Sequence, residues 1–183
     1  MTKVDLSKFD NSSYRPGRLL LARTIWYLLN VVFLKNYLNP FSGLKVFVLR
    51  LFSATIGRRV VIKPGANIKY PWNIVVGDHV WIGEKVWLDS LEKITIGNNV
   101  CISQGAYLCT GNHDYTKENF DLIVKPIVVE DGVWVGAKAI ICPGVTLRSH
   151  SVVTAGSIVT HDTEAYTIYQ GNPAKAVRKR TIT

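Results

Sequence analysis

Aliphatic residues recur at every sixth position through the middle of the chain, between residues 56 and 159. Fifteen such positions, in five runs of three, all hold Ile, Leu or Val: Ile56, Ile62, Ile68, Val76, Ile82, Leu88, Ile96, Ile102, Leu108, Val129, Val135, Ile141, Leu147, Val153 and Val159. The position four residues after each is small or valine in twelve of the fifteen cases. It lies two residues before the next aliphatic, so both side chains point to the same side of a strand. Each six-residue unit therefore predicts one short strand and one corner.

Three such units complete one coil of a three-sided prism. The distances between successive coils, 20, 20, 33 and 18 residues, indicate extra residues at one corner. The longest excess predicts a loop at 114–128, directly after His113. Apolar spacings of three and four, typical of an amphipathic helix, are missing from this stretch. We expect an all-β parallel β-helix of about five coils over residues 56–165.

The two ends of the chain follow other patterns. Residues 16–38 predict an apolar helix with a narrow polar stripe, and Ser42 is expected to be the N-cap of a second helix reaching Phe52. We expect this 1–55 segment to cap the open first coil, to lie in the plane of an anionic membrane, or to do both. The membrane alternative assigns lipid contacts to Lys3, Lys8, Arg15, Arg18, Lys35, Lys45 and Arg50. Asn172-Pro173 should break the coil, leaving a basic tail over 166–183.

Composition narrows the class of protein. A chain of 183 residues with 48% hydrophobic residues can bury one core, which excludes global disorder. Its net charge of +9 is concentrated at both ends, and no nucleic-acid recognition motif accompanies it. Three cysteines without C-x-x-C spacing, and a start that lacks the layout of a secretory signal, lead us to expect a cytoplasmic protein. Peripheral contact with the inner face of the cell membrane is compatible with the basic ends.

Several motifs resemble those of the hexapeptide-repeat acetyltransferases. They are the repeated Ile-Gly-x-x-Val and Pro-Gly-Val units, Val133-Trp134-Val135-Gly136-Ala137, Ala155-Gly156-Ser157-Ile158-Val159-Thr160 and Gly171-Asn172-Pro173-Ala174-Lys175. The segments 25–30 and 103–114 resemble most the O-acetyltransferases of colanic acid biosynthesis. The resemblance implies a left-handed β-helix, a homotrimer with sites between subunits, and acetyl-CoA as co-substrate without a metal. The expected acceptor is a sugar or a lipid-linked oligosaccharide.

The resemblance also assigns site residues. Gly111-Asn112-His113 resembles the catalytic histidine motif, which makes His113 the expected general base. The expected acceptor-binding residues are Asp89, Glu84, Trp87 and Asn112. The expected cofactor-binding residues are Trp134, Ala137, Ala155, Thr160, Lys175 and Arg178.

The 20-residue spacing makes further predictions about these side chains. Asp89 should face outward and lie one coil below Cys109, not below His113, so a direct bond between Asp89 and His113 of one subunit is not expected. Trp87 and Tyr107 should stack on one outer face, for packing or for binding a sugar ring. Cys109 lies near His113, but direct transfer, as in the family, would not use it as a nucleophile.

These observations favour an acetyl-CoA-dependent O-acetyltransferase that acts on a sugar hydroxyl during exopolysaccharide synthesis. The alternative is a xenobiotic acetyltransferase of the streptogramin type, which shares the Asn-His and Gly-Asn-Pro elements. A zinc enzyme like the gamma-class carbonic anhydrases is disfavoured, because Glu118 stands where a third histidine would follow His79 and His113. A non-catalytic scaffold is disfavoured by His113 and the basic tail.

Overall fold

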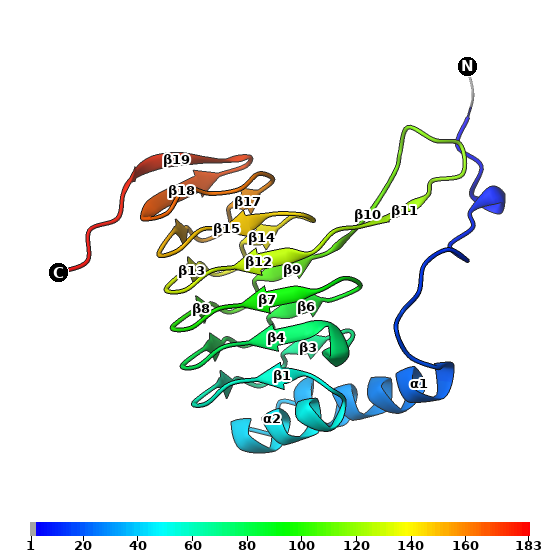
Figure 1. Cartoon of the computed structure of the whole chain (residues 1–183), viewed down its shortest axis with the longest axis horizontal. Coiled ribbons are helices and arrows are strands. Elements are labelled where there is room, and N and C mark those ends of the chain that lie inside the picture. Colours follow the sequence, from blue (N-terminus) through cyan, green and yellow to red (C-terminus); the bar gives the residue numbers. More distant parts are fainter. Residues whose placement is uncertain (1–2) are drawn as a thin grey trace.

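The computed structural model describes residues 3–183 and shows a parallel β-helix whose three faces are three parallel sheets (Figure 1). Face A contains β1 (Thr55–Ile56), β4 (Ile74–Val76), β7 (Ile94–Ile96), β12 (Ile127–Val129) and β15 (Thr146–Leu147). Face B contains β2 (Val61–Ile62), β5 (Trp81–Ile82), β8 (Cys101–Ile102), β13 (Trp134–Val135), β16 (Val152–Val153) and β18 (Thr167–Gly171). Face C contains β3 (Asn67–Ile68), β6 (Trp87–Asp89), β9 (Tyr107–Cys109), β14 (Ile140–Ile141) and β17 (Ile158–Val159). The predicted β-helix is confirmed, with five complete coils and the beginning of a sixth.

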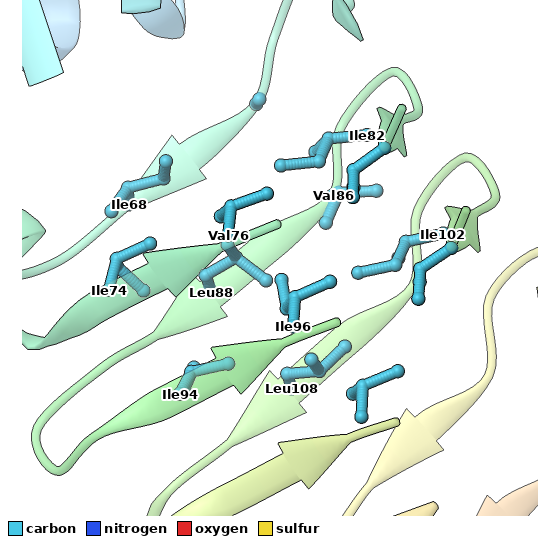
Figure 2. Close-up of a cluster of buried hydrophobic side chains, with 14 of the residues drawn as sticks. Ile68, Ile74, Val76, Ile82, Val86, Leu88, Ile94, Ile96, Ile102 and Leu108 are labelled. Atoms are coloured by element: carbon cyan, nitrogen blue, oxygen red, sulfur yellow. The ribbon is translucent and has the colours of Figure 1, made fainter. Parts of the chain in front are cut away.

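The interior of the prism is built from the six-residue repeat. All fifteen aliphatic positions are buried, and so are the twelve small or valine positions that follow them. Figure 2 shows Ile82, Leu88 and Ile96 reaching from neighbouring strands into one shared interior. Coils stack in the register that the 20-residue spacing predicts, with Asp89 paired to Cys109. Burial of this column of aliphatic side chains is the main stabilising term of the fold.

The long insertion is a β-hairpin rather than a loop. Strands β10 (Gly111–His113) and β11 (Leu122–Val124) pair antiparallel and project from the coil as one arm (Figure 1). The coil is left after the buried Thr110 and resumed at Ile127, so the expected bounds 114–128 were wrong at both ends. The physical reason is that the Lys125 N–H donates to the Thr110 carbonyl, which closes the base of the arm. His113 therefore lies on the hairpin and not at a corner of the prism.

The N-terminal segment forms helices beneath the first coil. The short 3-10 turn η1 (Leu6–Lys8) precedes α1 (Leu20–Leu29), which continues into the π-helical turn η2 (Asn30–Leu34). The α2 helix spans Ser42–Leu51, and one more 3-10 turn, η3 (Pro71–Asn73), occupies a corner of the second coil. The first helix is thus shorter than the predicted 16–38. Among residues 3–183, no helix combines the length and apolarity that crossing a bilayer requires.

Side chains of these helices bind the open edge of the first coil on every face. Carbonyl groups of the lowest strands have no strand below them, and buried acceptors need donors. Arg50 donates to the Ile56 carbonyl on face A at 2.7 Å. Lys45 donates to the Ile62 carbonyl on face B at 3.0 Å, and Trp26 Nε1 donates to the Ile68 carbonyl on face C at 2.9 Å. Each face thus receives at least one helical donor.

Two expectations about this segment were wrong. Ser42 is not an N-cap: Phe41 holds that position, and the Ser42 hydroxyl instead accepts from the Ile62 N–H. Lys45 is fully buried and cannot contact lipid. Burial, followed by the nearby charge of Lys63, lowers the pKa of Lys45. Arg50 donates to the carbonyls of residues 56 and 57 but remains exposed, so its predicted contact with lipid stays a prediction.

The far end of the chain is folded and not a free tail. Strand β18 pairs with β16 on face B, and β19 (Ala174–Lys179) folds back antiparallel along β18. The turn between them contains a cis Asn172–Pro173 bond. This hairpin covers the upper end of face B, as Figure 1 shows. The basic side chains of 175–180 are consequently held on a strand.

Candidate active site

The imidazole of His113 is held by the tip of its own hairpin. Its Nδ1 lies 2.9 Å from the Phe120 carbonyl oxygen, and the two rings stack with centroids 4.4 Å apart. Phe120 adopts a φ of 52°, which is uncommon for a residue other than glycine. The Asn112 side-chain oxygen accepts from the His113 N–H at 2.8 Å. The ring position is therefore fixed by local contacts within the arm.

This geometry also selects the tautomer. A carbonyl oxygen has no proton, so Nδ1 carries the hydrogen and donates it to Phe120. The other nitrogen, Nε2, then has a free lone pair and makes no hydrogen bond to any of residues 3–183. A neutral imidazole with a free Nε2 is ready to accept a proton from a hydroxyl group.

The N-terminal residues lie along the outside of the hairpin (Figure 1). The Asp5 N–H donates to the Glu118 carbonyl, and the Lys8 ammonium is 2.6 Å from the Glu118 carboxylate. The Phe9 ring centroid lies 5.7 Å from that of His113. Sequence reasoning missed Phe9 and Phe120, because their contacts to the histidine span loops that follow no repeat.

Asp89 belongs to a buried polar cluster on face C. Only 7% of the residue is exposed, so Asp89 is not a solvated surface aspartate. Tyr107 donates its hydroxyl to Oδ2 at 3.1 Å, and the Lys69 ammonium lies 3.3 Å from Oδ1 as an ion pair without hydrogen-bond alignment. Burial, with additional contributions from Cys109 and Asp89, raises the pKa of Tyr107, which keeps the phenol protonated as a donor. Lys69 was missed, although it lies 20 residues before Asp89 in the repeat.

Aromatic and sulfur groups continue this cluster along face C. Trp87 and Tyr107 stack as predicted, with ring centroids 4.6 Å apart. The Trp87 side chain remains 40% exposed, so one part of the ring is open to a ligand. The Cys109 thiol donates to the Gly111 carbonyl at 3.0 Å, at the base of the arm that carries His113.

Two predicted acceptor residues lie apart from this cluster. Glu84 is exposed in the corner between β5 and β6, where it lines a groove of about 300 Å³ with Trp81 and Gln104. That groove follows face B, not face C. The Asn112 side chain is committed to the His113 backbone. Within one subunit the structure therefore brings Asp89 and Trp87 together, and Glu84 and Asn112 lie elsewhere.

Three of the predicted cofactor residues share one groove on face B. Trp134, Ala137 and Ala155 line a groove of about 380 Å³, in which Trp134 Nε1 donates to Ser103 at 2.9 Å. The coils approach closely there, since a Cβ on Gly136 would lie 2.6 Å from the Ala155 nitrogen. Ser103 and Gln104 also line the groove that holds Glu84, so the two grooves are adjacent. Small side chains and exposed backbone make this face suitable for a narrow, extended ligand.

The other cofactor candidates are not part of that groove. Thr160 is exposed and its hydroxyl lies 2.9 Å from His161 Nδ1. Lys175 and Arg178 are exposed on β19, where they pair with Gln170 and Ile168. Both cations are free of ion pairs within residues 3–183, unlike the neighbouring Lys179, which is 2.8 Å from Glu164. Within the same described residues, no three His, Cys, Asp or Glu side chains gather closely enough to share a metal ion.

Comparisons with known proteins agree with this geometry. Residues 126–161 match the family model described as the hexapeptide repeat of succinyl-transferase. WcaF of Escherichia coli K12, named as a colanic acid biosynthesis acetyltransferase, is 37% identical over 180 residues, with 98% of each chain covered. Galactoside O-acetyltransferase of the same strain is 32% identical over 90% of this chain and 80% of its own.

A solved structure supports the same assignment. The hexapeptide-repeat acetyltransferase VCA0836 of Vibrio cholerae, crystallised with acetyl-CoA, has a TM-score of 0.82 at 26% identity. The match covers 95% of this chain and 93% of that one. The protein is therefore an acetyl-CoA-dependent acyltransferase, and its chain belongs to the hexapeptide-repeat acetyltransferase family.

Proposed function

We propose that the enzyme transfers the acetyl group of acetyl-CoA directly to a sugar hydroxyl, in exopolysaccharide biosynthesis, with His113 as the general base. The observation that carries the proposal is the bond from Nδ1 to the Phe120 carbonyl, which leaves Nε2 free to accept a proton. The names of the relatives WcaF and galactoside O-acetyltransferase support a sugar acceptor.

The reaction balances around His113. Nε2 takes the proton from the acceptor hydroxyl while that oxygen attacks the thioester carbonyl carbon. The tetrahedral intermediate then expels the CoA sulfur as the carbon–sulfur bond breaks, and the imidazolium returns the proton to the thiolate. One imidazole can accept a proton and then return it, so a single group serves both steps.

The groove on face B is the proposed place of acetyl-CoA. Trp134, Ala137 and Ala155 would line the pantetheine arm, largely through backbone groups. Thr160 lies near the upper end of the prism, and Lys175 and Arg178 are the proposed partners of the CoA phosphates. These cations are exposed and already ordered on β19, which lowers the entropic cost of binding.

We also propose that the enzyme is a homotrimer. Within one subunit, the groove on face B and the Asp89 cluster on face C lie on different faces of the prism. Packing face B of one subunit against a neighbour's hairpin side would unite donor groove, base and acceptor residues in one site. In that arrangement Glu84 and Asn112 join Asp89 and Trp87 around the acceptor.

The test of the proposal is acetyl transfer followed by mass spectrometry with a panel of sugars, sugar phosphates and a streptogramin. We expect a sugar product, and His113→Ala should lower turnover by about 10²–10⁴-fold, the usual contribution of a general base. Acetyl-CoA binding and the melting temperature should barely change, because the side chain lies on an arm outside the core.

The matched control is His79→Asn. His79 is exposed at a corner with a φ of 60°, which asparagine tolerates. Equal turnover in His113→Ala and His79→Asn would refute the assigned base. Acetylation of the streptogramin alone would move the enzyme to the xenobiotic class.

A further inference from the structure

A pocket of about 420 Å³ lies between α1 and the lower part of face C. The helix contributes Arg23 and Tyr27 to its wall, and the following turn contributes Lys35. The first two coils contribute Lys69, Tyr70 and Trp87. This pocket is separate from the grooves on face B, but its rim includes the exposed ring of Trp87.

The charge of the pocket is one-sided. The lining residues of the pocket include three cations, Arg23, Lys35 and Lys69, and no acidic residue. The Nε of Arg23 is buried and has no hydrogen-bond partner among residues 3–183. A buried donor without an acceptor is costly, and a guanidinium matches the paired oxygens of a phosphate. Lys69 is tied to Asp89 through its ion pair, so it is held in place at the pocket wall, which stays net positive.

The aromatic residues indicate what accompanies the phosphate. Trp87 is 40% exposed at the rim and is supported from above by Tyr107 at 4.6 Å. Tyr70 is held in the wall by stacking on Trp72 at 4.9 Å. A supported ring with an open part offers an apolar platform for the flat face of a sugar.

We infer that this pocket binds a phosphorylated sugar, with the phosphate between Arg23 and Lys69 and the ring against Trp87. The inference rests on the proposed sugar acetyltransferase function and names the class of its acceptor. The same chemistry occurs in a soluble sugar phosphate and in a lipid-linked one. Leu20 and Tyr27, exposed by 70% and 63%, adjoin the pocket, so an alkyl chain on the phosphate would find an apolar path along α1.

The test is calorimetric titration of the full chain with four probes: glucose, inorganic phosphate, glucose 1-phosphate and decyl phosphate. We expect glucose 1-phosphate to bind, and Arg23→Gln and Lys69→Met each to weaken it by about tenfold or more, the usual loss of a charge-assisted bond. Trp87→Leu should weaken glucose 1-phosphate but not inorganic phosphate. Arg18→Gln removes the same charge two residues before α1, where Arg18 donates to Ser53, and should change binding by less than about twofold.

The outcomes distinguish a soluble sugar phosphate from a lipid-linked one. Tighter binding of decyl phosphate than of glucose 1-phosphate, with the same dependence on Arg23, supports a lipid-linked acceptor, and the reverse order supports a soluble one. Failure of both probes to bind, or equal losses in Arg23→Gln and Arg18→Gln, would overturn the inference. Arg23→Lys checks folding, because it keeps the charge and loses only the guanidinium fork; it should bind phosphate at intermediate strength.

Binding is measured here without turnover. Arg23-dependent binding in a protein that acetylates no sugar would therefore remove the proposed function and leave the phosphate site. Sugar acetylation that is indifferent to Arg23 and Lys69 would do the opposite.

Discussion

One backbone carbonyl determines what His113 can do. Because the Phe120 carbonyl accepts from Nδ1, the proton acceptor Nε2 is set before any substrate arrives. The stacked Phe120 ring and the nearby Phe9 ring restrict the imidazole further. Preorganisation of this kind reduces the reorganisation that the reaction must overcome.

Cys109 is the side chain that distinguishes direct from two-step transfer. Its thiol is already committed to the Gly111 carbonyl at 3.0 Å, a bond that a serine hydroxyl can also make. We expect Cys109→Ser to keep most of the turnover. Intact-protein mass spectrometry after incubation with acetyl-CoA is the check: an acetyl-thioester on the unchanged chain, together with a dead variant, would show a covalent intermediate.

Lys45 makes stability depend on alkaline pH. Burial lowers its pKa in the folded state below the ordinary 10.5, so between these two values the unfolded chain binds more protons. Stability from this group therefore rises as the pH rises through that window. Tyr14 and Tyr107, whose pKa values are raised mainly by burial, act in the opposite direction above their ordinary value.

Lys45→Met isolates the lysine contribution. We compare the stability of the variant with that of the unchanged protein by urea denaturation. The free energy of unfolding of the variant minus that of the unchanged protein should be more positive at pH 7 than at pH 10. Lys93→Met is the control, because Lys93 is exposed and belongs to the third coil, whereas Lys45 lies beneath the first. A difference that does not vary with pH would mean that burial does not lower the pKa of Lys45 in the folded state.

At the scale of elements, the inner and outer sides of α1 and α2 differ in chemistry. Their inner side chains supply the donors for the first coil. The outer side chains of these helices and of the residues that flank them are apolar and exposed, among them Leu19, Leu21, Leu28, Leu38, Phe41 and Phe47. With Lys45 buried, the exposed cations beside this apolar surface are Arg15, Arg18, Lys35 and Arg50. We propose that the surface lies on an anionic bilayer.

The membrane proposal predicts a measurable dependence on two leucines. Leu21 and Leu28 are 71% and 58% exposed and two helical turns apart. The double substitution to serine should weaken binding to phosphatidylglycerol vesicles by more than about tenfold, from lost apolar burial. Val177→Ser, at the opposite end of the prism, should have no effect. Vesicle flotation that is indifferent to salt and to these leucines would leave only the structural function.

The six-residue repeat predicted the stacked strands of the coils, but not the features that lie outside the repeat. Stacking of Trp87 on Tyr107, and of Cys109 over Asp89, followed from a spacing of 20. The burial of Asp89 did not, because the partners that offset it come from a neighbouring coil and strand. Gly111 and Asn112 fit a corner as well as they fit a hairpin, so the start of the arm was misplaced. Lys45 was expected to contact lipid, because no sequence pattern reveals that the Ile62 carbonyl at the edge of the first coil needs a donor.

At the scale of the whole molecule, one face of the prism exposes large aromatic side chains to solvent. Trp81 and Trp134 are 62% and 48% exposed on face B, beside the two grooves. Exposed aromatic side chains on one face are typical of an interface. The trimer proposal predicts that such surfaces become buried on assembly.

Sedimentation equilibrium tests that proposal. We expect a species of three times the 20.5 kDa of one chain. Trp81→Glu should shift the distribution toward monomer and lower activity together, whereas Val177→Glu, also on an exposed surface position, should do neither. A fully active monomer would contradict sites shared between subunits.

The three helical donors beneath the first coil have a consequence for polymerisation. A parallel coil is a template, because the free carbonyls at the open edge of its first coil can accept N–H groups from the end of another chain. Arg50, Lys45 and Trp26 each donate to one of these carbonyls on a different face, so every face of the first coil is blocked to an incoming strand. Chains that lose this segment should join end to end into fibres, so the helices act as the terminator that keeps a self-templating solenoid finite.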